Sequence, residues 1–128
     1  MNIDDLTIGE AKNLANMFGG GSRNPVGSEL IGQKVIVRAY RAGVHYGTLA
    51  DIDGENVKLT NARRLWFWQV YNKLGISLSD VAKHGISDQS KICAVVSTQI
   101  ITDAGEIITT SDVAQGRIEG ANVHSPKD

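Results

Sequence analysis

The central stretch of the chain, residues 34–68, constrains the fold most, because it contains three strand-like runs separated by two glycine turns. In the first run, Lys34–Ala39, apolar side chains recur with the period of two that is typical of a β-strand. Glycine accepts positive φ angles at no steric cost, so Ala42-Gly43 and Asp53-Gly54 predict tight turns. The stretch therefore predicts an antiparallel meander of three strands.

The second run of this meander, Val44–Ile52, carries apolar side chains on both of its faces. Either both faces are buried, or Gly47 forms a β-bulge that resets the alternation. The third run, Asn56–Leu59, places Val57 and Leu59 on one face. We expect this face to cover the hydrophobic core.

Helix and strand signals on either side of the meander complete an α+β fold. Residues 7–10 and residues 77–80 both have the hydroxyl-to-acid spacing of a capping box, and each predicts the start of a short helix. Residues 91–101 and 106–110 are rich in β-branched side chains and are typical of strands. We expect a small antiparallel β-sheet or partly open barrel, with a short N-terminal helix and one or two short helices after the meander.

The expected domain organisation has four parts. Helical spacing of apolar residues marks an N-terminal helical arm over residues 1–19, and a glycine-rich run marks a flexible linker over residues 20–31. The β-rich domain occupies residues 32–115. Residues 116–128 have little apolar content, and we expect them to form a loose C-terminal tail.

Composition places the chain among globular proteins, since 41% of its residues are hydrophobic and its net charge is −1. The charge is uneven, because residues 32–75 carry seven cationic and three acidic side chains. A locally positive surface favours anionic partners. No apolar run approaches the roughly 20 residues of a membrane span, and Asp4 and Asp5 stand where a signal peptide needs positive charge, so we expect no membrane association.

The sequence contains no signature of catalysis or metal binding. The single cysteine, Cys93, lies in an apolar run, which favours a buried, reduced thiol over a nucleophile. None of the three histidines has a partner at metal-ligand spacing, and no nucleophile elbow is present. We therefore expect a protein that is not an enzyme and that needs neither a metal nor a cofactor.

Six of the seven aromatic residues lie between residues 40 and 71. The densest group follows two arginines in the segment Arg63-Arg64-Leu65-Trp66-Phe67-Trp68. An N-cap at Asn61 would start a short helix over this segment, whereas alternation would suit a strand. The sequence leaves the choice open.

Arginine and aromatic side chains together indicate a binding surface for a flat anion. Guanidinium groups match the geometry of phosphates, and aromatic faces stack on bases. The alternative is that the aromatic side chains fill the core and the arginines are solvated. The predicted ligand-binding residues are Arg38, Tyr40, Arg41, His45, Tyr46, Arg63, Arg64, Trp66 and Trp68.

Several segments between residues 7 and 110 carry a family resemblance. They are the N-terminal helix and the runs GQKVIVRAYRAGVHYGTL (residues 32–49), ARRLWFW (62–68) and SLSDVAKHG (77–85). In these segments the chain resembles a family of small proteins encoded by tailed bacteriophages and prophages. The resemblance implies a phage accessory protein expressed in the cytoplasm of a bacterial host. It implies no activity and no site residues.

A second resemblance rests on the run from Gly47 to Leu59, with Gly-Thr-Leu at its start, Ile-Asp in the middle and Asn-Val near its end. This run is similar to the first signature of Sm-like RNA-binding rings, and Arg117–Val123 is similar to the second. The asparagine stands one place earlier than in that family, and the two signatures are further apart. The resemblance implies an RNA-binding protein.

These observations lead to one principal expectation and two alternatives. We expect a homo-oligomeric, β-rich protein that sequesters a small anionic, nucleotide-like ligand and so counters host defence signalling. The first alternative is a protein-interaction module that inhibits a host protein or serves in phage assembly. The second is an Sm-like RNA-binding protein, for which affinity would fall steeply with salt.

Overall fold

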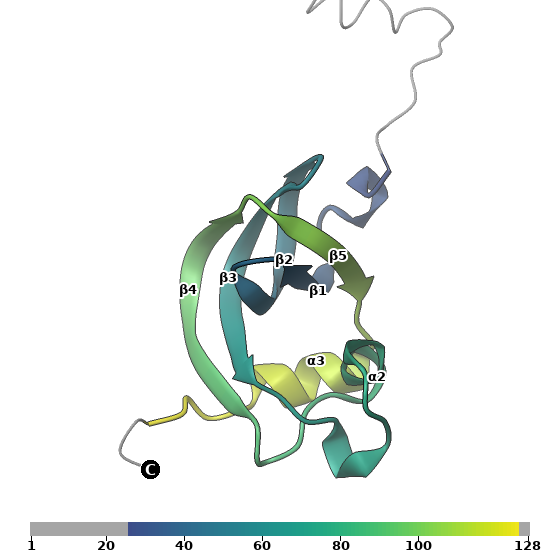
Figure 1. The fold of residues 1–128 in the computed structure, drawn as a ribbon, viewed down its shortest axis with the longest axis vertical. Coiled ribbons are helices and arrows are strands. Elements are labelled where there is room, and N and C mark those ends of the chain that lie inside the picture. The colour runs from purple at the N-terminus through teal and green to yellow at the C-terminus, as the bar shows by residue number, and fades with distance from the viewer. Residues whose placement is uncertain (1–25, 126–128) are drawn as a thin grey trace, which may run out of the picture.

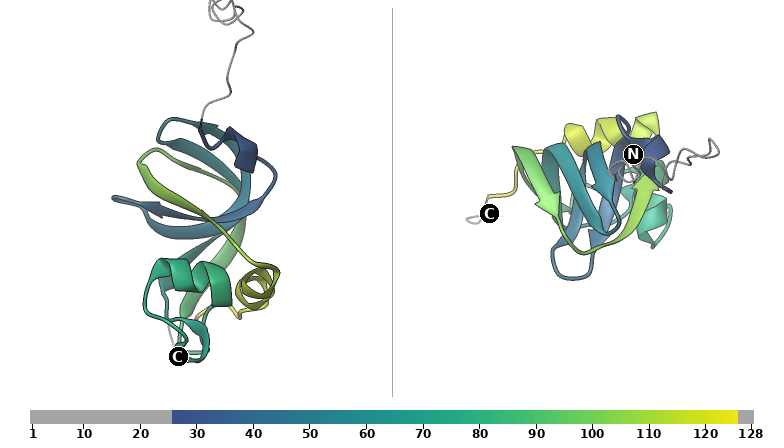
Figure 2. Two further views of the ribbon diagram at one scale, coloured as in Figure 1. Left: turned by 90° about the vertical axis from the view of Figure 1, so that its right-hand side faces the viewer. Right: turned by 90° about the horizontal axis from the view of Figure 1, so that it is seen from above.

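The computed structural model describes residues 26–125, which form a strongly curved antiparallel sheet with its two α-helices at one end (Figures 1 and 2). The α+β fold with a small antiparallel sheet, expected from the sequence, is confirmed. In chain order the elements are the 3₁₀ helix η2 (Ser28–Leu30), β1 (Lys34–Ala39), β2 (Gly43–Asp53), β3 (Asn56–Phe67), the 3₁₀ helix η3 (Tyr71–Lys73), α2 (Leu78–His84), β4 (Lys91–Ile101), β5 (Ala104–Thr109) and α3 (Asp112–Glu119).

The order of the strands forces the sheet to curl. The strands lie in the order β4-β3-β2-β1-β5, so β4 and β5 occupy opposite edges. In the sequence, however, only Thr102 and Asp103 separate these two strands. A chain spans at most about 3.6 Å per residue, so the two edges must approach each other at this end. The sheet is therefore a partly open barrel, as the curved ribbons of Figure 2 show.

The sequence left open whether both faces of β2 are buried or Gly47 forms a bulge. Both faces carry buried side chains, since His45 and Tyr46 are buried. The register between β2 and β3 also shifts opposite Gly47, but the extra residue lies on β3, which advances three residues from Arg63 to Thr60 while β2 advances two from Tyr46 to Thr48. A Cβ atom at Gly47 would lie 3.1 Å from the carbonyl oxygen of Thr60, which is tighter than most side chains tolerate. On β3, Asn61 has a φ of 50°, a left-handed conformation that asparagine adopts more readily than most residues. The irregularity changes which side chains of β3 face each core, since Leu59 and Ala62 both belong to the barrel core.

β3 extends well beyond the predicted third run and ends at Phe67. The segment for which the sequence left helix and strand open is a strand up to this residue, because Leu65 pairs with Ile92 and Phe67 pairs with Lys91. This pairing joins residues far apart in the sequence. The aromatic segment therefore takes its conformation from a neighbouring strand and not from local propensity.

The sheet separates two hydrophobic cores. In β1, the fully buried Val35 and Val37 belong to one core and the fully buried Ile36 belongs to the other. The core inside the barrel consists of Val35, Val37, Ala39, Leu49, Val57, Leu59, Ala62 and Ile101. The core between the sheet and the helices consists of Ile36, Tyr46, Leu65, Val70, Leu78, Val81, Ala82, Ile86, Ile92 and Ile118.

α2 begins with the capping box that the sequence predicts. The Ser77 side chain accepts a hydrogen bond from Asp80 N–H, and the Asp80 carboxylate accepts hydrogen bonds from the backbone N–H groups of Ser77 and Ile76. These hydrogen bonds to the charged form hold the pKa of Asp80 below its ordinary value. The cap directs Leu78 and Val81 into the core between the sheet and the helices.

The loose C-terminal tail was predicted to begin at residue 116, but residues 112–119 form the helix α3. The predicted boundary is therefore wrong. Ser111 caps this helix by accepting a hydrogen bond from Ala114 N–H at 3.1 Å. Ala114 and Ile118, one helical turn apart, are fully buried. These two buried residues are enough to hold α3 on the protein, since packing against an existing core supplies most of the stability of a short helix. Within residues 26–125, no helix has the length and apolar character that a membrane span requires.

The predicted N-terminal arm and most of the predicted linker lie outside the described residues. The described part of the linker, residues 26–31, contains η2 and is folded onto the sheet. Leu30 packs against the barrel core. After it, Gly32 N–H donates to Leu49 O at 2.8 Å, and Leu49 N–H donates to Gln33 O at 2.9 Å. The prediction of a flexible linker is therefore wrong for residues 26–31.

Ile118→Ala tests the packing of α3. The substitution removes a fully buried side chain from the core between the sheet and the helices, so we expect the free energy of unfolding to fall by about 2–5 kcal/mol. Val113→Ala on the same helix is the control, because Val113 is 54% exposed, and should change stability by no more than about 0.5 kcal/mol. Equal urea midpoints for the two variants would show that residues 112–119 do not dock.

Candidate ligand-binding groove

A groove opens between the loop that follows β3 and the loop that precedes β4. One wall consists of residues 68–76, apart from Leu74, and the other consists of residues 87–89. The groove has a volume of about 940 Å³. Small-molecule sites have volumes of roughly 300–1,000 Å³, so the groove can hold a ligand of the size of a nucleotide.

Hydrogen bonds hold the two walls together. Gln69 N–H donates to Ser90 Oγ at 3.0 Å, and Ser87 N–H donates to Gln69 O at 2.9 Å. Further along the wall, Tyr71 N–H donates to Gly85 O at 3.0 Å. The relative position of the two loops is therefore fixed before any ligand arrives.

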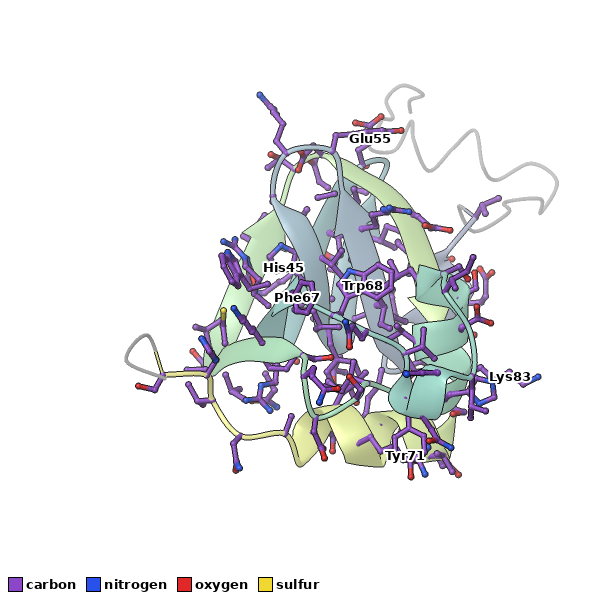
Figure 3. The ribbon with its side chains drawn as sticks, turned by 60° about the horizontal axis from the view of Figure 1, so that its bottom comes forward. His45, Glu55, Phe67, Trp68, Tyr71 and Lys83 are labelled. Atoms are coloured by element: carbon purple, nitrogen blue, oxygen red, sulfur yellow. The ribbon has the colours of Figure 1, made fainter. Side chains whose placement is uncertain are left out.

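α3 supports the groove wall from behind through Tyr71. The guanidinium carbon of Arg117 lies 3.4 Å from the centroid of the Tyr71 ring, and Arg117 Nη1 donates to His84 O at 2.8 Å. Figure 3 shows Tyr71 beside α3, with Trp68 further up in front of the strands. A cation–π contact of this kind contributes about 0.5–2 kcal/mol. The wall is thus coupled to α3 and to the end of α2.

The turn at η3 is strained. Asn72 has a φ of 51° and Lys73 a φ of 56°, so two consecutive residues with side chains adopt the left-handed region. This conformation is uncommon for residues other than glycine. Both residues line the groove. Strain of this kind clusters at binding and active sites, where the surrounding structure holds it in place.

Next to the groove, four side chains at the end of β3 and the start of β4 form what we call the cationic aromatic patch: Arg64, Trp66, Phe67 and Lys91. The register between β3 and β4 shifts between Leu65 and Phe67, so β3 contains a bulge at this point. Lys91 Nζ lies 5.3 Å from the centroid of the Trp66 ring and 6.0 Å from that of Phe67. Since one ammonium group contacts both rings, they face the same side, contrary to the alternation expected of a regular strand.

The cationic aromatic patch is exposed and positively charged. Trp66 is 66% exposed and Phe67 is 41% exposed, although large aromatic side chains are usually well buried. Neither Arg64 nor Lys91 forms an ion pair with any carboxylate in the described part of the chain. The patch therefore presents two aromatic surfaces together with two cations whose charge no neighbouring acid neutralises.

The groove itself adds hydrogen-bonding groups and little charge. Gln69 and Gln89 carry amides that can donate and accept, while Lys73 and Asp88 are the charged side chains among its lining residues. Trp68, which is half-buried, lines the groove beside them. This chemistry suits a flat polar ligand that stacks on an aromatic ring and exchanges hydrogen bonds with amides. Within residues 26–125, no cluster of His, Cys, Asp and Glu is arranged to hold a metal ion.

The structure brings only part of the predicted site together. Arg64, Trp66 and Trp68 lie at the groove or in the cationic aromatic patch. Arg38, Tyr40 and Arg41 lie elsewhere, at the turn between β1 and β2. There Arg38 Nη1 is 3.9 Å from Glu106 Oε1, and Arg41 Nε is 3.6 Å from Asp103 Oδ2. Each of these two arginines has an acidic partner in the fold, which reduces the charge available to a ligand.

Arg63 is buried and stabilises the fold, so its assignment to an exposed ligand-binding surface is wrong. Its guanidinium donates to the backbone carbonyls of Cys93 at 2.8 Å, Ile118 at 3.0 Å and Ala121 at 2.9 Å. The last turn of a helix leaves carbonyl groups without a partner inside the helix, and cations are favoured there. Arg63 thus joins β3 and β4 to the C-terminal end of α3.

Tyr46 and His45 are also buried. The Tyr46 hydroxyl donates to Glu119 Oε2, which also receives Lys34 Nζ at 2.9 Å. Burial is the main cause that raises the pKa of Tyr46. His45 Nε2 lies 2.7 Å from Ala42 O, and a carbonyl only accepts, so Nε2 carries the proton. Burial lowers the pKa of His45, so neither side chain belongs to an exposed site.

Sequence reasoning did not include Phe67, Lys91 and Gln69 in the site. In the strand alternative, Phe67 would face away from Trp66, and only the bulge between β3 and β4 turns both to one side. Lys91 is 23 residues from Trp68 in the sequence and reaches the patch through the Phe67–Lys91 strand pair. The only local signal was that polar side chains such as Gln69 and Lys91 are usually exposed. This is true of most surface residues, so it could not identify a site.

A family model described as a domain of unknown function, DUF6948, matches residues 32–118 of the chain. The matched segment contains all five strands, the groove and the cationic aromatic patch. It also contains α3 up to Ile118, so it includes most of the helix that supports Tyr71. No curated protein matches the chain.

Arg63→Met and Arg64→Met form a matched pair that separates a structural arginine from a surface arginine. Arg63→Met leaves the carbonyls at the end of α3 without their donor, so we expect a loss of about 2 kcal/mol or more in the free energy of unfolding. Arg64→Met should change it by no more than about 0.5 kcal/mol, because Arg64 is exposed. Urea denaturation checks both, and equal losses would contradict the structural role of Arg63.

The Glu119 carboxylate gives stability a defined pH dependence. Hydrogen bonds from Tyr46 and Lys34 hold the pKa of Glu119 below its ordinary value of 4.5. Because the folded-state pKa is the lower one, the unfolded chain binds the proton more tightly. The stabilisation by Glu119 is therefore complete above pH 4.5 and is lost as the pH falls through the folded-state pKa.

We expect Glu119→Gln to be less stable than the natural chain at neutral pH and to approach its stability as the solution becomes acidic. Urea midpoints measured from about pH 7 down to about pH 3 check this. Glu106→Gln is the control, because Glu106 and Arg38 are both well exposed and their ion pair is long. A Glu119→Gln difference that does not change with pH would contradict the role of the carboxylate.

Proposed function

The chain belongs to the DUF6948 family, and we propose that it binds a small planar anion of the nucleotide class in the groove and on the cationic aromatic patch. In this proposal the protein is not an enzyme. It sequesters the ligand as a phage accessory protein in the cytoplasm of a bacterial host and so counters defence signalling. The phage setting is supported by the sequence resemblance of residues 7–110 alone, whereas the binding chemistry is supported by the site.

One observation carries the binding proposal: two exposed aromatic rings stand beside two cations that have no acidic partner among residues 26–125. Exposing Trp66 and Phe67 forgoes the stabilisation that their burial would give. A base that stacks on such a ring gains about 1–3 kcal/mol. Arg64 can receive a phosphate through its planar fork, and Lys91 adds a second charge. Stacking and phosphate recognition together select a nucleotide over a simple anion.

The groove supplies the remaining selectivity. It begins next to the cationic aromatic patch along the chain, because its wall starts at Trp68, directly after Phe67, and Gln69 bonds to Ser90, next to Lys91. A base placed over Trp66 or Phe67 therefore has the amides of Gln69 and Gln89 within the adjoining groove. Amide side chains distinguish bases by the pattern of donors and acceptors along their edges.

A protein-interaction module is the second candidate, and exposed apolar residues on the same loop favour it. Ile76 is 93% exposed, Leu74 is 51% exposed, and Tyr71 beside them is 36% exposed. Apolar side chains grouped on one exposed loop are typical of a surface that contacts another protein. In this candidate the groove receives a segment of a host protein instead of a small molecule.

Titration calorimetry of the full chain against a panel of mononucleotides and cyclic nucleotides tests the proposal. We expect binding of at least one nucleotide, and a loss of affinity of about 5- to 150-fold for Trp66→Ala, which removes a stacking surface. Lys91→Ala should weaken binding and reduce its salt dependence. Tyr40→Ala and Arg38→Ala are matched controls, since they remove an exposed ring and an exposed arginine outside the groove.

Two results would contradict the nucleotide proposal. One is the absence of binding to every member of the panel. The other is equal losses for Tyr40→Ala and Trp66→Ala, because the ligand would then lie elsewhere. Binding only to a single-stranded RNA oligonucleotide, with an affinity that falls steeply with salt, would favour the Sm-like alternative. Recovery of one stoichiometric host protein with no nucleotide binding would favour the protein-interaction module.

A further inference from the structure

β4 presents a long free edge. The strand order places β3 on one side of β4 and no strand of residues 26–125 along most of the other side. The exception is the start of β4, where Ile92 bridges Val123 and Ile92 O accepts a hydrogen bond from His124 N–H at 2.9 Å. Beyond this bridge, the outer backbone groups of β4 are available to another strand.

The free edge lacks the features that usually prevent strand addition. Protected edges carry charged side chains or proline, or are short. Residues 92–101 contain no charged residue, no proline and no glycine. Three apolar side chains of this stretch are exposed: Val95 at 54%, Val96 at 46% and Ile100 at 64%. Val95 and Val96 are adjacent and point to opposite faces of the strand, so an added strand would cover apolar surface on both faces.

We propose that β4 pairs with β4 of a second copy of this chain, antiparallel and across a two-fold axis. A copy related by two-fold symmetry presents the same stretch in the opposite direction, so the neutral residues 92–101 meet only neutral residues. An antiparallel edge also has donors and acceptors that match those of its own copy. The two sheets then form one continuous sheet.

The charges beyond the two ends of β4 favour a second copy over other partners. Lys91 and Arg64 lie at the start of the strand and give this end a positive charge. At the far end, Ala104 N–H donates to Glu55 O at 3.1 Å, which holds the acidic turn that contains Asp53 and Glu55 next to the end of β4. Lys58, opposite Ile100, offsets only one of these two negative charges. Antiparallel pairing places the positive end of one copy near the negative end of the other. The pairing is therefore favoured by charge as well as by shape.

Sedimentation equilibrium of the full chain, over a range of concentrations and without added nucleotide, tests this assembly. We expect a reversible dimer with twice the chain mass of 13.8 kDa. Val96→Lys places a cation of each copy against the partner strand, so the dissociation constant should rise at least about tenfold. Val113→Lys is the matched control, because Val113 has a similar exposure and lies on α3, and its dissociation constant should equal that of the natural chain.

Ser97→Lys gives a second, independent disruption at a neighbouring exposed position, and circular dichroism establishes that each variant is folded. The proposal is overturned if the natural chain is monomeric at all concentrations. It is also overturned if both folded variants associate as tightly as the natural chain. A monomeric chain that dimerises once residues 1–25 are removed would assign the edge to that segment instead. None of these outcomes depends on nucleotide binding, so the dimer and the proposed ligand can fail separately.

Discussion

The two-residue connection between β4 and β5 is the constraint on which the rest of the fold depends. It brings together the edges of a five-stranded sheet. Its residues also form hydrogen bonds with the turns that join β1 to β2 and β2 to β3. Asp103 is buried; its backbone carbonyl accepts a hydrogen bond from Tyr40 N–H and its carboxylate accepts one from Arg41 N–H, in the turn between β1 and β2. Next to it, Ala104 binds Glu55 in the turn between β2 and β3. With the two edges of the sheet joined by this short connection at one end, the opposite end is left to the helices and the groove.

Neighbouring residues of the same type have opposite roles in this fold because strand alternation decides their surroundings. Arg63 points toward α3 and donates to the carbonyls of Ile118 and Ala121 at its C-terminal end, whereas Arg64 points outward and keeps its charge exposed. Trp66 and Phe67 would follow the same rule, but the bulge in β3 places both rings on one side. A regular ladder would therefore have divided the cationic aromatic patch between two faces of the sheet.

The sequence was a good guide to the meander and the cap of α2, because each depends on residues close together in the chain. It could not reveal the site, which depends on contacts between distant segments. The burial of Arg63 requires knowing that α3 ends above β3, and the exposure of Trp66 requires knowing the register of β4. α3 itself was missed because its two buried residues, Ala114 and Ile118, make a weak apolar pattern.

The contact between Tyr71 and Arg117 has a consequence for the order in which the protein matures during synthesis. The first three strands are adjacent in the sequence and can pair as soon as they leave the ribosome. The groove wall acquires its support only after residue 117 has emerged, when α3 brings its arginine to the tyrosine ring. The groove wall is therefore complete only in chains whose β4, β5 and α3 are already in place, and the nucleotide binding that we propose would begin only after synthesis of the domain is finished.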